Sequence, residues 1–459
     1  MANKLKKRVK HLRTISMWCK SFSSEEKELV RMLSIHASQM YNVCLYSLRQ
    51  AFFKKEKMPS DTELYHATKL NENFSLLLND CSQQIRRVAY SDMKAFFGSL
   101  KAKKSANKTN TINLPRYKKN RKKNKPTYSN IVIQGRSVRF VKNKIDLEKD
   151  TVNRVVINCS KNFKKEYPHL LNKLEISIPK HIKKINEVRI LPKSNGEEFK
   201  VEVVYEVEED KAMEDNGRYL SIDLGLNNLG ACLNSTNGSS ILLDGRYLKS
   251  LNQWYNKKAA KLSSKIDLGR NNNQDVSAMI KKKNKLSRNR TNKINDYYHR
   301  STNYIVEYCL KNNLNTILVG ENKEQKQSIN IGSVNNQSFV SVPFFKFKNM
   351  LEYKAKSKGL IFAKHEESYT SKTSFLDLEE VKKHKSYLGT RSKRGLFKSS
   401  LGLLLNADVN GAGNILRKWL KSRGDFEMWR DQYFEEASRG IVNCPKKIRL
   451  ECLHTNFGF

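Results

Sequence analysis

The stretch from Arg218 to Leu233 constrains the fold of this chain more than any other part of the sequence. Its sequence, RYLSIDLGLNNLGACL, places apolar, β-favouring residues on both sides of the turn residues 225–228. This pattern predicts two short strands joined by a tight turn. A third apolar run, Ser239 to Asp244, follows a second turn, so the sequence predicts an antiparallel three-stranded meander. One carboxylate, Asp223, lies near the end of the first strand.

Two further carboxylates stand in similar contexts later in the chain. Glu321 ends the apolar strand NTILVGE, and Asp408 opens the helical run NADVNGAGNILRK. An Asp close to a Gly often does no more than favour a turn, but the three together are the set that an RNase H-like nuclease fold converges on its metal ions. Carboxylate oxygens suit Mg²⁺, and two ions about 4 Å apart can hydrolyse a phosphodiester. We therefore expect Asp223 to bridge two ions, and Glu321 and Asp408 each to orient one.

These motifs resemble those of a known family. The patterns ID-x-G-x-x-N-x-G, VGE-N and NADVNGAGNILRK look like the three RuvC motifs of the TnpB family of transposon-encoded, RNA-guided DNA nucleases, which are relatives of compact type V CRISPR effectors. The resemblance covers roughly residues 189–421, whereas the first half of the chain matches more in layout than in letters. Further resembling segments lie at 190–209, 290–309, 368–377 and 389–397.

The charge of the chain narrows the class of its partners. Lys and Arg number 87 against 45 acidic residues, which leaves a net charge of +42. Such an excess repels itself unless a polyanion neutralises it. The sequence has no apolar run of about 18 residues that could span a membrane, and its basic N-terminus lacks the apolar core of a signal peptide. We therefore expect nucleic acid, and no membrane, as partner, and a cytoplasmic, nucleoid-associated location in a prokaryote.

Cysteine usage argues against a zinc site. The eight cysteines are scattered, and no C-x-x-C occurs. Many TnpB-like proteins carry a four-cysteine zinc ribbon between the second and third motifs. This chain has no cysteine between those motifs. His365 and His384 have no cysteine partners nearby in the sequence, so we interpret them as ordinary residues. No zinc is expected.

The order of segments predicts a multidomain α+β chain. By resemblance, a helical recognition lobe is inserted in a small β-barrel (wedge) domain that grips RNA, and an RNase H-like RuvC nuclease domain without a zinc ribbon follows. The predicted boundaries are 1–20 for the first strand of the wedge barrel, 21–104 for the helical recognition lobe, 105–213 for the wedge barrel, 214–366 for the RuvC domain with a basic helical hairpin at 251–309, 367–402 for a target-nucleic-acid-binding segment lacking zinc ligands, and 403–459 for the third-motif helix and C-terminal tail.

Several local expectations follow from the apolar periodicity. Residues 61–78 are expected to form one helical region, and 128–141 one strand. The basic hairpin is expected to consist of helices at 253–285 and 286–309, and residues 322–342 are expected to be mobile because they are polar.

Basic and aromatic residues in three segments are candidates for contact with nucleic acid. Contacts of this kind with phosphates give affinity and salt dependence rather than sequence choice. The candidates are Arg116, Lys118, Lys119, Arg121, Lys122 and Lys123 in the basic linker, Arg288 and Arg290 in the hairpin, and Tyr369, Lys372, Lys393 and Arg394 before the third motif.

The resemblance implies an RNA-guided, Mg²⁺-dependent endodeoxyribonuclease, with Mn²⁺ able to substitute. Its guide RNA would come from the end of its transposon and pair with double-stranded target DNA beside a short flanking motif. It would act as a monomer or as a weak dimer on RNA. A compact type V CRISPR effector would share every motif. A cleavage-inactive guided repressor would need a broken carboxylate set, and a transposase in its own right is a further alternative.

Overall fold

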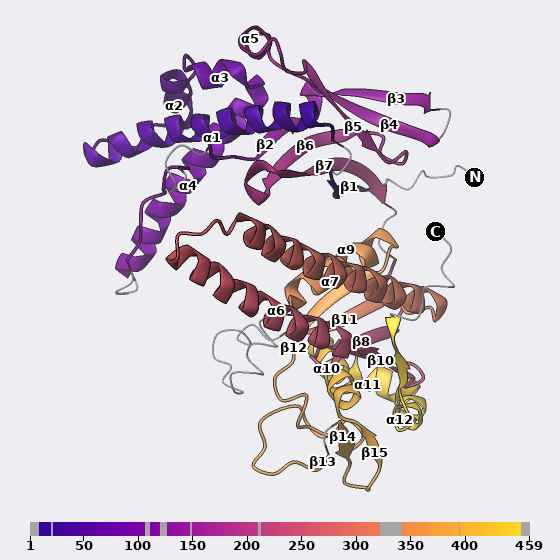
Figure 1. The fold of residues 1–459 in the computed structure, drawn as a ribbon. Coiled ribbons are helices and arrows are strands. Elements are labelled where there is room, and N and C mark those ends of the chain that lie inside the picture. Colours follow the sequence, from indigo (N-terminus) through magenta and orange to yellow (C-terminus); the bar gives the residue numbers. More distant parts are fainter. Residues whose placement is uncertain are drawn as a thin grey trace. The chain divides into compact units, whose positions relative to one another are not determined.

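The fold class of the chain is mixed α+β, as the sequence predicts. The chain folds into two compact units. The computed structural model describes residues 9–19, 22–105, 111–119, 126–146, 149–209, 213–321, 342–393 and 395–450. One unit is Lys10–Glu208, and the other is Glu209–Phe459 with Met1–Val9 (Figure 1). The predicted mobility of 322–342 concerns residues that, apart from Val342, lie outside the described ones.

The first unit holds two sheets and a group of helices. The first sheet has the order β1 (Val9–Trp18), β7 (Glu198–Glu209), β6 (Ile185–Lys193) and β2 (Ile131–Gln134). The second sheet has the order β3 (Arg139–Asp146), β4 (Lys149–Asn158) and β5 (Lys173–Ile178). The predicted barrel is not confirmed, because the described strands form these two separate sheets. Between β1 and β2 the chain forms α1 (Ser24–Phe53), α2 (Asp61–Thr68), α3 (Glu72–Leu76) and α4 (Asn79–Ser105), and α5 (Lys161–Glu166) follows β4.

Local capping explains where these helices begin. Ser23 and Glu26 form a capping box before α1, in which Ser23 Oγ accepts from the Glu26 amide at 3.1 Å and Glu26 Oε2 accepts from the Ser23 amide at 2.8 Å. The single helical region expected for 61–78 is wrong. The side chain of Asn71 accepts from the Asn73 amide at 3.0 Å and starts α3 as a separate helix.

The single strand expected for 128–141 is also wrong. A 3₁₀ turn, Gly135–Ser137, separates β2 from β3. At this turn the backbone of Gly135 lies against the carbonyl oxygen of Ile185, where a Cβ atom would overlap that oxygen. The chain therefore leaves the first sheet at a glycine and enters the second.

The second unit is built on a six-stranded sheet with the order β12-β11-β8-β9-β10-β16. Its strands are β8 (Tyr219–Asp223), β9 (Asn228–Asn234), β10 (Ser240–Asp244), β11 (Thr316–Glu321), β12 (Ile361–Glu366) and β16 (Lys446–Ile448). Successive pairing of β8, β9 and β10 is antiparallel, so the predicted meander is confirmed. The remaining pairs, β8 with β11, β11 with β12 and β10 with β16, are parallel.

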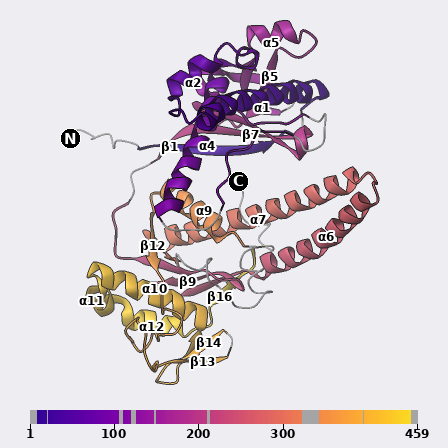
Figure 2. The ribbon, with the colours of Figure 1, turned by 90° about the vertical axis from the view of Figure 1, so that its left-hand side faces the viewer.

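Helices cover both faces of this sheet (Figure 2). One face packs against α6 (Arg246–Asn271), α7 (Ser277–Lys311) and α9 (Phe344–Ser357). The other packs against α10 (Ala407–Arg423), α11 (Phe426–Trp429), a π-helical turn (Arg430–Phe434) and α12 (Glu435–Ile441). A small sheet of β13 (Thr390–Lys393), β14 (Leu396–Lys398) and β15 (Leu404–Asn406) precedes α10. We call the two faces the α9 face and the α10 face.

The predicted hairpin of two basic helices is present, but its predicted break is wrong. The turn lies between α6 and α7 at 272–276 rather than at 285–286. Asn273 has φ of 53°, a left-handed conformation that asparagine tolerates better than most residues. The polar run 271–274 therefore ends the first helix, although the basic periodicity continues past it. Within the described parts of the chain, no helix combines the length and apolarity needed to cross a membrane.

Candidate functional site

Asp223 and Asp408 meet on the α10 face of the sheet. Side chains alternate along β8, and Leu220 and Ile222 pack on the α9 face, so Asp223 points toward α10. The strand lies directly on the helix backbone, because Ser221 Oγ donates to the Ala412 carbonyl at 2.5 Å. A Cβ atom at Gly411 would overlap Asp223 Oδ2. Glycine has no Cβ, so it leaves the space that the Asp223 carboxylate occupies.

The electrostatics of Asp223 favour a bound cation. Loss of hydration, together with the negative charges of Glu367 and Asp408, raises the pKa of Asp223 well above its ordinary value. The Arg391 guanidinium opposes this shift. A carboxylate in such surroundings holds its charge at a cost, which a nearby cation would offset.

Asp408 is held by the start of α10 and by the first residue of β9. It is the second residue of the helix, where the positive end of the helix dipole favours an acidic side chain. Asn406 caps the helix, and its Oδ1 accepts from the Asp408 amide at 3.0 Å. Asn228 Nδ2 donates to Asp408 Oδ2 at 2.8 Å and so orients the carboxylate.

Glu321 ends the neighbouring parallel strand but lies on the other face. Alternation along β11 places Val319 in the core of the α9 face, and Glu321 follows it two residues later. Its Oε1 pairs with Lys348 Nζ of α9 at 3.2 Å. The three predicted carboxylates thus come to one end of the sheet. Among the described side chains, however, no group of three or more Asp, Glu, His or Cys is close enough to hold a metal ion.

Glu367 is a fourth carboxylate at this end of the sheet that the motifs did not identify. It follows β12, the parallel neighbour of β11, and its Oε2 fills the space where a Cβ of Gly320 would lie. A Cβ at Gly320 would also lie 2.7 Å from Ile415 Cδ1 of α10, so this space is on the α10 face. Burial raises the pKa of Glu367, and the Lys348 ammonium opposes the shift. The sequence did carry a signal for Glu367: β11 ends in Glu321, and its neighbour β12 ends in Glu366, directly before Glu367.

A buried polar stripe on α10 holds the segment that follows Glu367. Asn410, Asn414 and Arg417 lie one helical turn apart, and their side chains are fully buried. Asn410 Nδ2 donates to the Thr373 carbonyl at 2.8 Å, and Arg417 Nη2 donates to the Glu379 carbonyl at 2.8 Å. Residues 367–389 contain no described helix or strand. Some of their carbonyls accept from amides within the segment, and those of Thr373 and Glu379 accept from the α10 side chains.

Two family models match segments that lie mostly in the second unit. Residues 202–326 match the family model OrfB_IS605, described as a probable transposase, and residues 344–415 match the model of the Cas12f1-like TNB domain. The protein named "Putative transposase A625R" of Paramecium bursaria Chlorella virus 1 is 27% identical over 210 residues. That match spans 44% of this chain and 44% of the viral protein, so it covers less than half the length of this relative.

Solved structures share the fold. A chain in the cryo-EM structure of the Cas12f1–sgRNA–target DNA complex has a TM-score of 0.54 at 18% identity, covering 86% of this chain and 83% of that chain. The family matches agree with the resemblance seen in the motifs, and the Cas12f1 chain shows that the fold is shared. The chain is similar to the TnpB family. The mini-RNA-guided endonuclease CRISPR-Cas_phi3 aligns with a TM-score of 0.44 at 12% identity, covering 89% of this chain and 92% of that chain, which is too distant to add to the argument.

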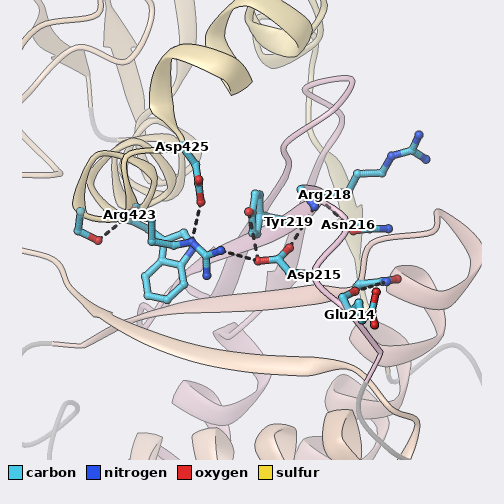
Figure 3. Close-up of polar contacts among 11 residues, drawn as sticks. Glu214, Asp215, Asn216, Arg218, Tyr219, Arg423 and Asp425 are labelled. Atoms are coloured by element: carbon cyan, nitrogen blue, oxygen red, sulfur yellow. Dashed lines mark hydrogen bonds and ion pairs between the residues drawn. The ribbon is translucent and has the colours of Figure 1, made fainter.

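In this TnpB-like chain, α10 is anchored at the end opposite Asp408. Figure 3 shows Arg423 between Asp425 and Asp215, the latter placed before the start of β8. Arg423 Nη2 lies 3.1 Å from Asp215 Oδ2, and its Nε lies 2.7 Å from Asp425 Oδ2. Burial, followed by the charge of Asp215, raises the pKa of Tyr219 to about 12. This network links the last turn of α10 to the residues just before β8.

The basic linker of the TnpB-like chain is described in part. Arg116 and Lys119 are exposed. Lys118 Nζ instead donates to Ser129 Oγ at 2.7 Å and lies 4.0 Å from the centroid of the Tyr41 ring. A phosphate contact at Lys118 would have to displace these partners. The remaining linker candidates, Arg121, Lys122 and Lys123, lie outside the described residues.

The other predicted nucleic-acid contacts lie in the second unit. Arg288 is half-buried on α7, and Arg290 Nε donates to Asn252 Oδ1 at 2.6 Å while its guanidinium lies over the ring of Tyr255. These contacts hold the two helices of the hairpin together as well as placing charge there. Tyr369, Lys372 and Lys393 are exposed, and Arg394 lies outside the described residues.

Proposed function

We propose that this chain is an RNA-guided DNA endonuclease of the TnpB type whose second unit is an RNase H-like RuvC domain. This proposal is supported by three antiparallel strands followed by two parallel ones, with Asp223 on the first strand and Asp408 on a helix across the sheet. The observation that carries the proposal is the approach of Asp223 to Asp408 on the α10 face. The parallel pairing of β11 with β8 supports placing Glu321 at the same end of the sheet.

The donor set fits a hard divalent cation. Every candidate ligand is a carboxylate, which is the donor that Mg²⁺ prefers, and the site holds several more negative than positive charges. Asp223 and Asp408 would hold the ion or ions, and Glu321 would join them on release from Lys348. When bound, Mg²⁺ supplies Lewis acidity for water and for the leaving oxygen of a phosphodiester. Mn²⁺ is expected to substitute.

Other residues prepare the site for its substrate. Asn228 holds the Asp408 carboxylate in one orientation, and Gly411 leaves room for that of Asp223. Arg391 lies near enough to act on the charge of Asp223, so its guanidinium is placed to neutralise a phosphate there. In this proposal Asn228 and Gly411 position the carboxylates, Arg391 neutralises the phosphate, and the carboxylates bind the metal.

The substrate and guide are proposed from charge and likeness. A net charge of +42 is suited to binding both RNA and DNA, and the Cas12f1 chain that shares the fold is in a complex with sgRNA and target DNA. We propose that the helices of 21–104 contact the guide–target duplex and its flanking motif, that the sheets of 105–213 bind the RNA scaffold, and that 367–402 contacts target DNA. A compact type V CRISPR effector is the second candidate, favoured by the match of 344–415 to the Cas12f1-like TNB domain.

The proposal is tested by expressing the chain with the DNA that flanks its gene. We expect a defined RNA to co-purify, and the complex to cut a guide-matched target in Mg²⁺ when a library of randomised flanking bases is supplied. Sequencing of the cut products gives the flanking motif, and the origin of the RNA separates a transposon end from a repeat array. Target binding without cleavage would indicate a guided repressor, and absence of any bound RNA would refute the guided mechanism.

Glu367 and Glu321 provide a matched pair for testing which glutamate serves the metal. Glu367 shares the α10 face with Asp223, whereas Glu321 is paired with Lys348. We expect Glu367→Gln to weaken Mn²⁺ binding by about tenfold, an effect typical of groups that support metal ligands. Calorimetric titration of the RNA-bound protein with Mn²⁺ measures this without any need for cleavage. If only Glu321→Gln weakened binding, Glu367 would have no part in the metal site.

A further inference from the structure

A cleft of about 660 Å³ opens beside Asp408 in the second unit. Asp408 and Asn228 form one part of its wall, and four cationic side chains, Arg246, Lys249, Arg391 and Lys447, form much of the rest. Among the described residues that line the cleft, Asp408 is the one carboxylate. A concave wall of one charge concentrates the potential inside it and attracts the opposite charge.

Two of these cations, Arg246 and Lys447, pair with a single buried carboxylate, which also pairs with the nearby Arg449. Asp244, at the end of β10, has a side chain only 10% exposed. Its Oδ1 lies 3.3 Å from Arg246 Nε, and its Oδ2 lies 3.7 Å from both Lys447 Nζ and Arg449 Nε. One carboxylate cannot neutralise three cations. Asp244 therefore fixes their positions and leaves the surrounding surface positive.

The strand β16 adds one of these cations to the cleft. It pairs in parallel with β10, so that Lys447 lies opposite Leu242. Leu242 belongs to the core of the α10 face, and Ile448 to that of the α9 face. Alternation therefore places Lys447 on the α10 face, beside Asp408, and Lys446 on the opposite face. Arg246 and Lys249 stand one turn apart on α6 and face the same cleft.

We infer that this cleft binds the phosphodiester backbone of the DNA strand being cut, on one side of the scissile bond. The inference rests on the proposed nuclease function. Lysine and arginine bind phosphate oxygens, and the amide of Asn227 adds an uncharged donor at the wall. Because Asp408 forms part of the same wall, a backbone lying in the cleft leads directly into the carboxylates.

The test compares two adjacent lysines of one strand. Lys447→Gln removes a charge from the cleft, and Lys446→Gln removes the same charge from the other face. A double variant, Lys249→Gln with Lys447→Gln, removes two charges from the cleft. For each RNA-bound protein, single-turnover cleavage of a guide-matched duplex is measured in Mg²⁺ over a range of salt concentrations. Guide-dependent target capture is measured in EDTA, and retention of guide RNA is measured separately.

We expect Lys447→Gln to slow cleavage about tenfold and the double variant to slow it further, with a shallower salt dependence. Capture and RNA retention should stay unchanged, and Lys446→Gln should behave as wild type. Equal rates for Lys447→Gln and Lys446→Gln would overturn the inference while leaving the nuclease intact. Loss of guide RNA from Lys447→Gln would assign the cleft to RNA and also overturn it. If the wild type bound RNA and target but left the DNA uncut, the proposed function itself would fail, and this inference with it.

Discussion

Replacing Asp223 by asparagine is expected to abolish DNA cleavage and at the same time to stabilise the metal-free protein. The amide has the size of the carboxylate, so it fits beside Gly411, but it cannot supply the negative oxygen that Mg²⁺ needs. Loss of several kcal/mol of transition-state stabilisation corresponds to a fall of about a thousandfold or more in the cleavage rate. In EDTA the variant lacks a charge that Glu367 and Asp408 repel, so its unfolding midpoint should rise.

The stabilisation should depend on pH in a defined direction. The pKa of Asp223 is raised in the folded protein. Between the ordinary pKa of an aspartate and this raised value, the folded state therefore binds more protons than the unfolded state. Stability contributed by Asp223 is present at low pH and is lost as the pH rises through the raised pKa. We expect the stability difference between Asp223→Asn and wild type, measured in EDTA, to grow over that range.

The matched control lies just before the opposite end of the same strand. Asp215 precedes β8 and pairs with Arg423 (Figure 3), and Asp215→Asn should leave cleavage intact because exposed pairs contribute about 1 kcal/mol or less. Adding Mg²⁺ should raise the unfolding midpoint of wild type and of Asp215→Asn, but much less that of Asp223→Asn. If Asp223→Asn cut DNA at the wild-type rate, or if both variants lost activity equally, the assignment of Asp223 would be wrong.

Replacing Arg417 by alanine is expected to destabilise the second unit by about 3–5 kcal/mol. The Arg417 side chain is fully buried. Its Nη1 donates to the Ser374 carbonyl at 3.1 Å, and its Nη2 donates to the Glu379 carbonyl at 2.8 Å. Burial lowers the pKa of this arginine to about 10, and the Glu379 carboxylate opposes the shift. Alanine would leave these carbonyls without donors and open a cavity next to the segment that follows Glu367.

Two further variants serve as a surface control and separate the effect of the cavity from that of the lost hydrogen bonds. Lys421 lies one turn along the same helix and is exposed, so Lys421→Ala should change stability by only about 0.5 kcal/mol. Arg417→Met restores apolar volume and should cost less than Arg417→Ala. The measurements are the denaturant midpoint of the full chain and hydrogen exchange at 369–379, which should speed up in Arg417→Ala. Exchange and midpoint equal to those of Lys421→Ala would show that Arg417 does not hold this segment.

The local sequence was enough to predict the parts of the site that depend on short-range physics. Apolar alternation around Asp223 predicted the meander, and the apolar run before Glu321 predicted β11. The helical period after Asp408 predicted α10. These patterns depend only on the two-residue period of strands and the 3.6-residue period of helices. The break between α6 and α7 was predicted wrongly because a left-handed asparagine, and not the charge pattern, decides it.

Tertiary structure alone decided which side chains share a face. Glu321 pairs with Lys348 on the α9 face, whereas Glu367 lies against Gly320 near Asp223. Strand register and helix packing between distant segments determine such neighbours, and no local pattern encodes them. The same holds for Lys447, which reaches the cleft only because β16 pairs with β10. The sequence by itself determined which carboxylates the chain offers, and the packing of α10 across the sheet decided which of them meet, because that contact joins residues far apart in the chain.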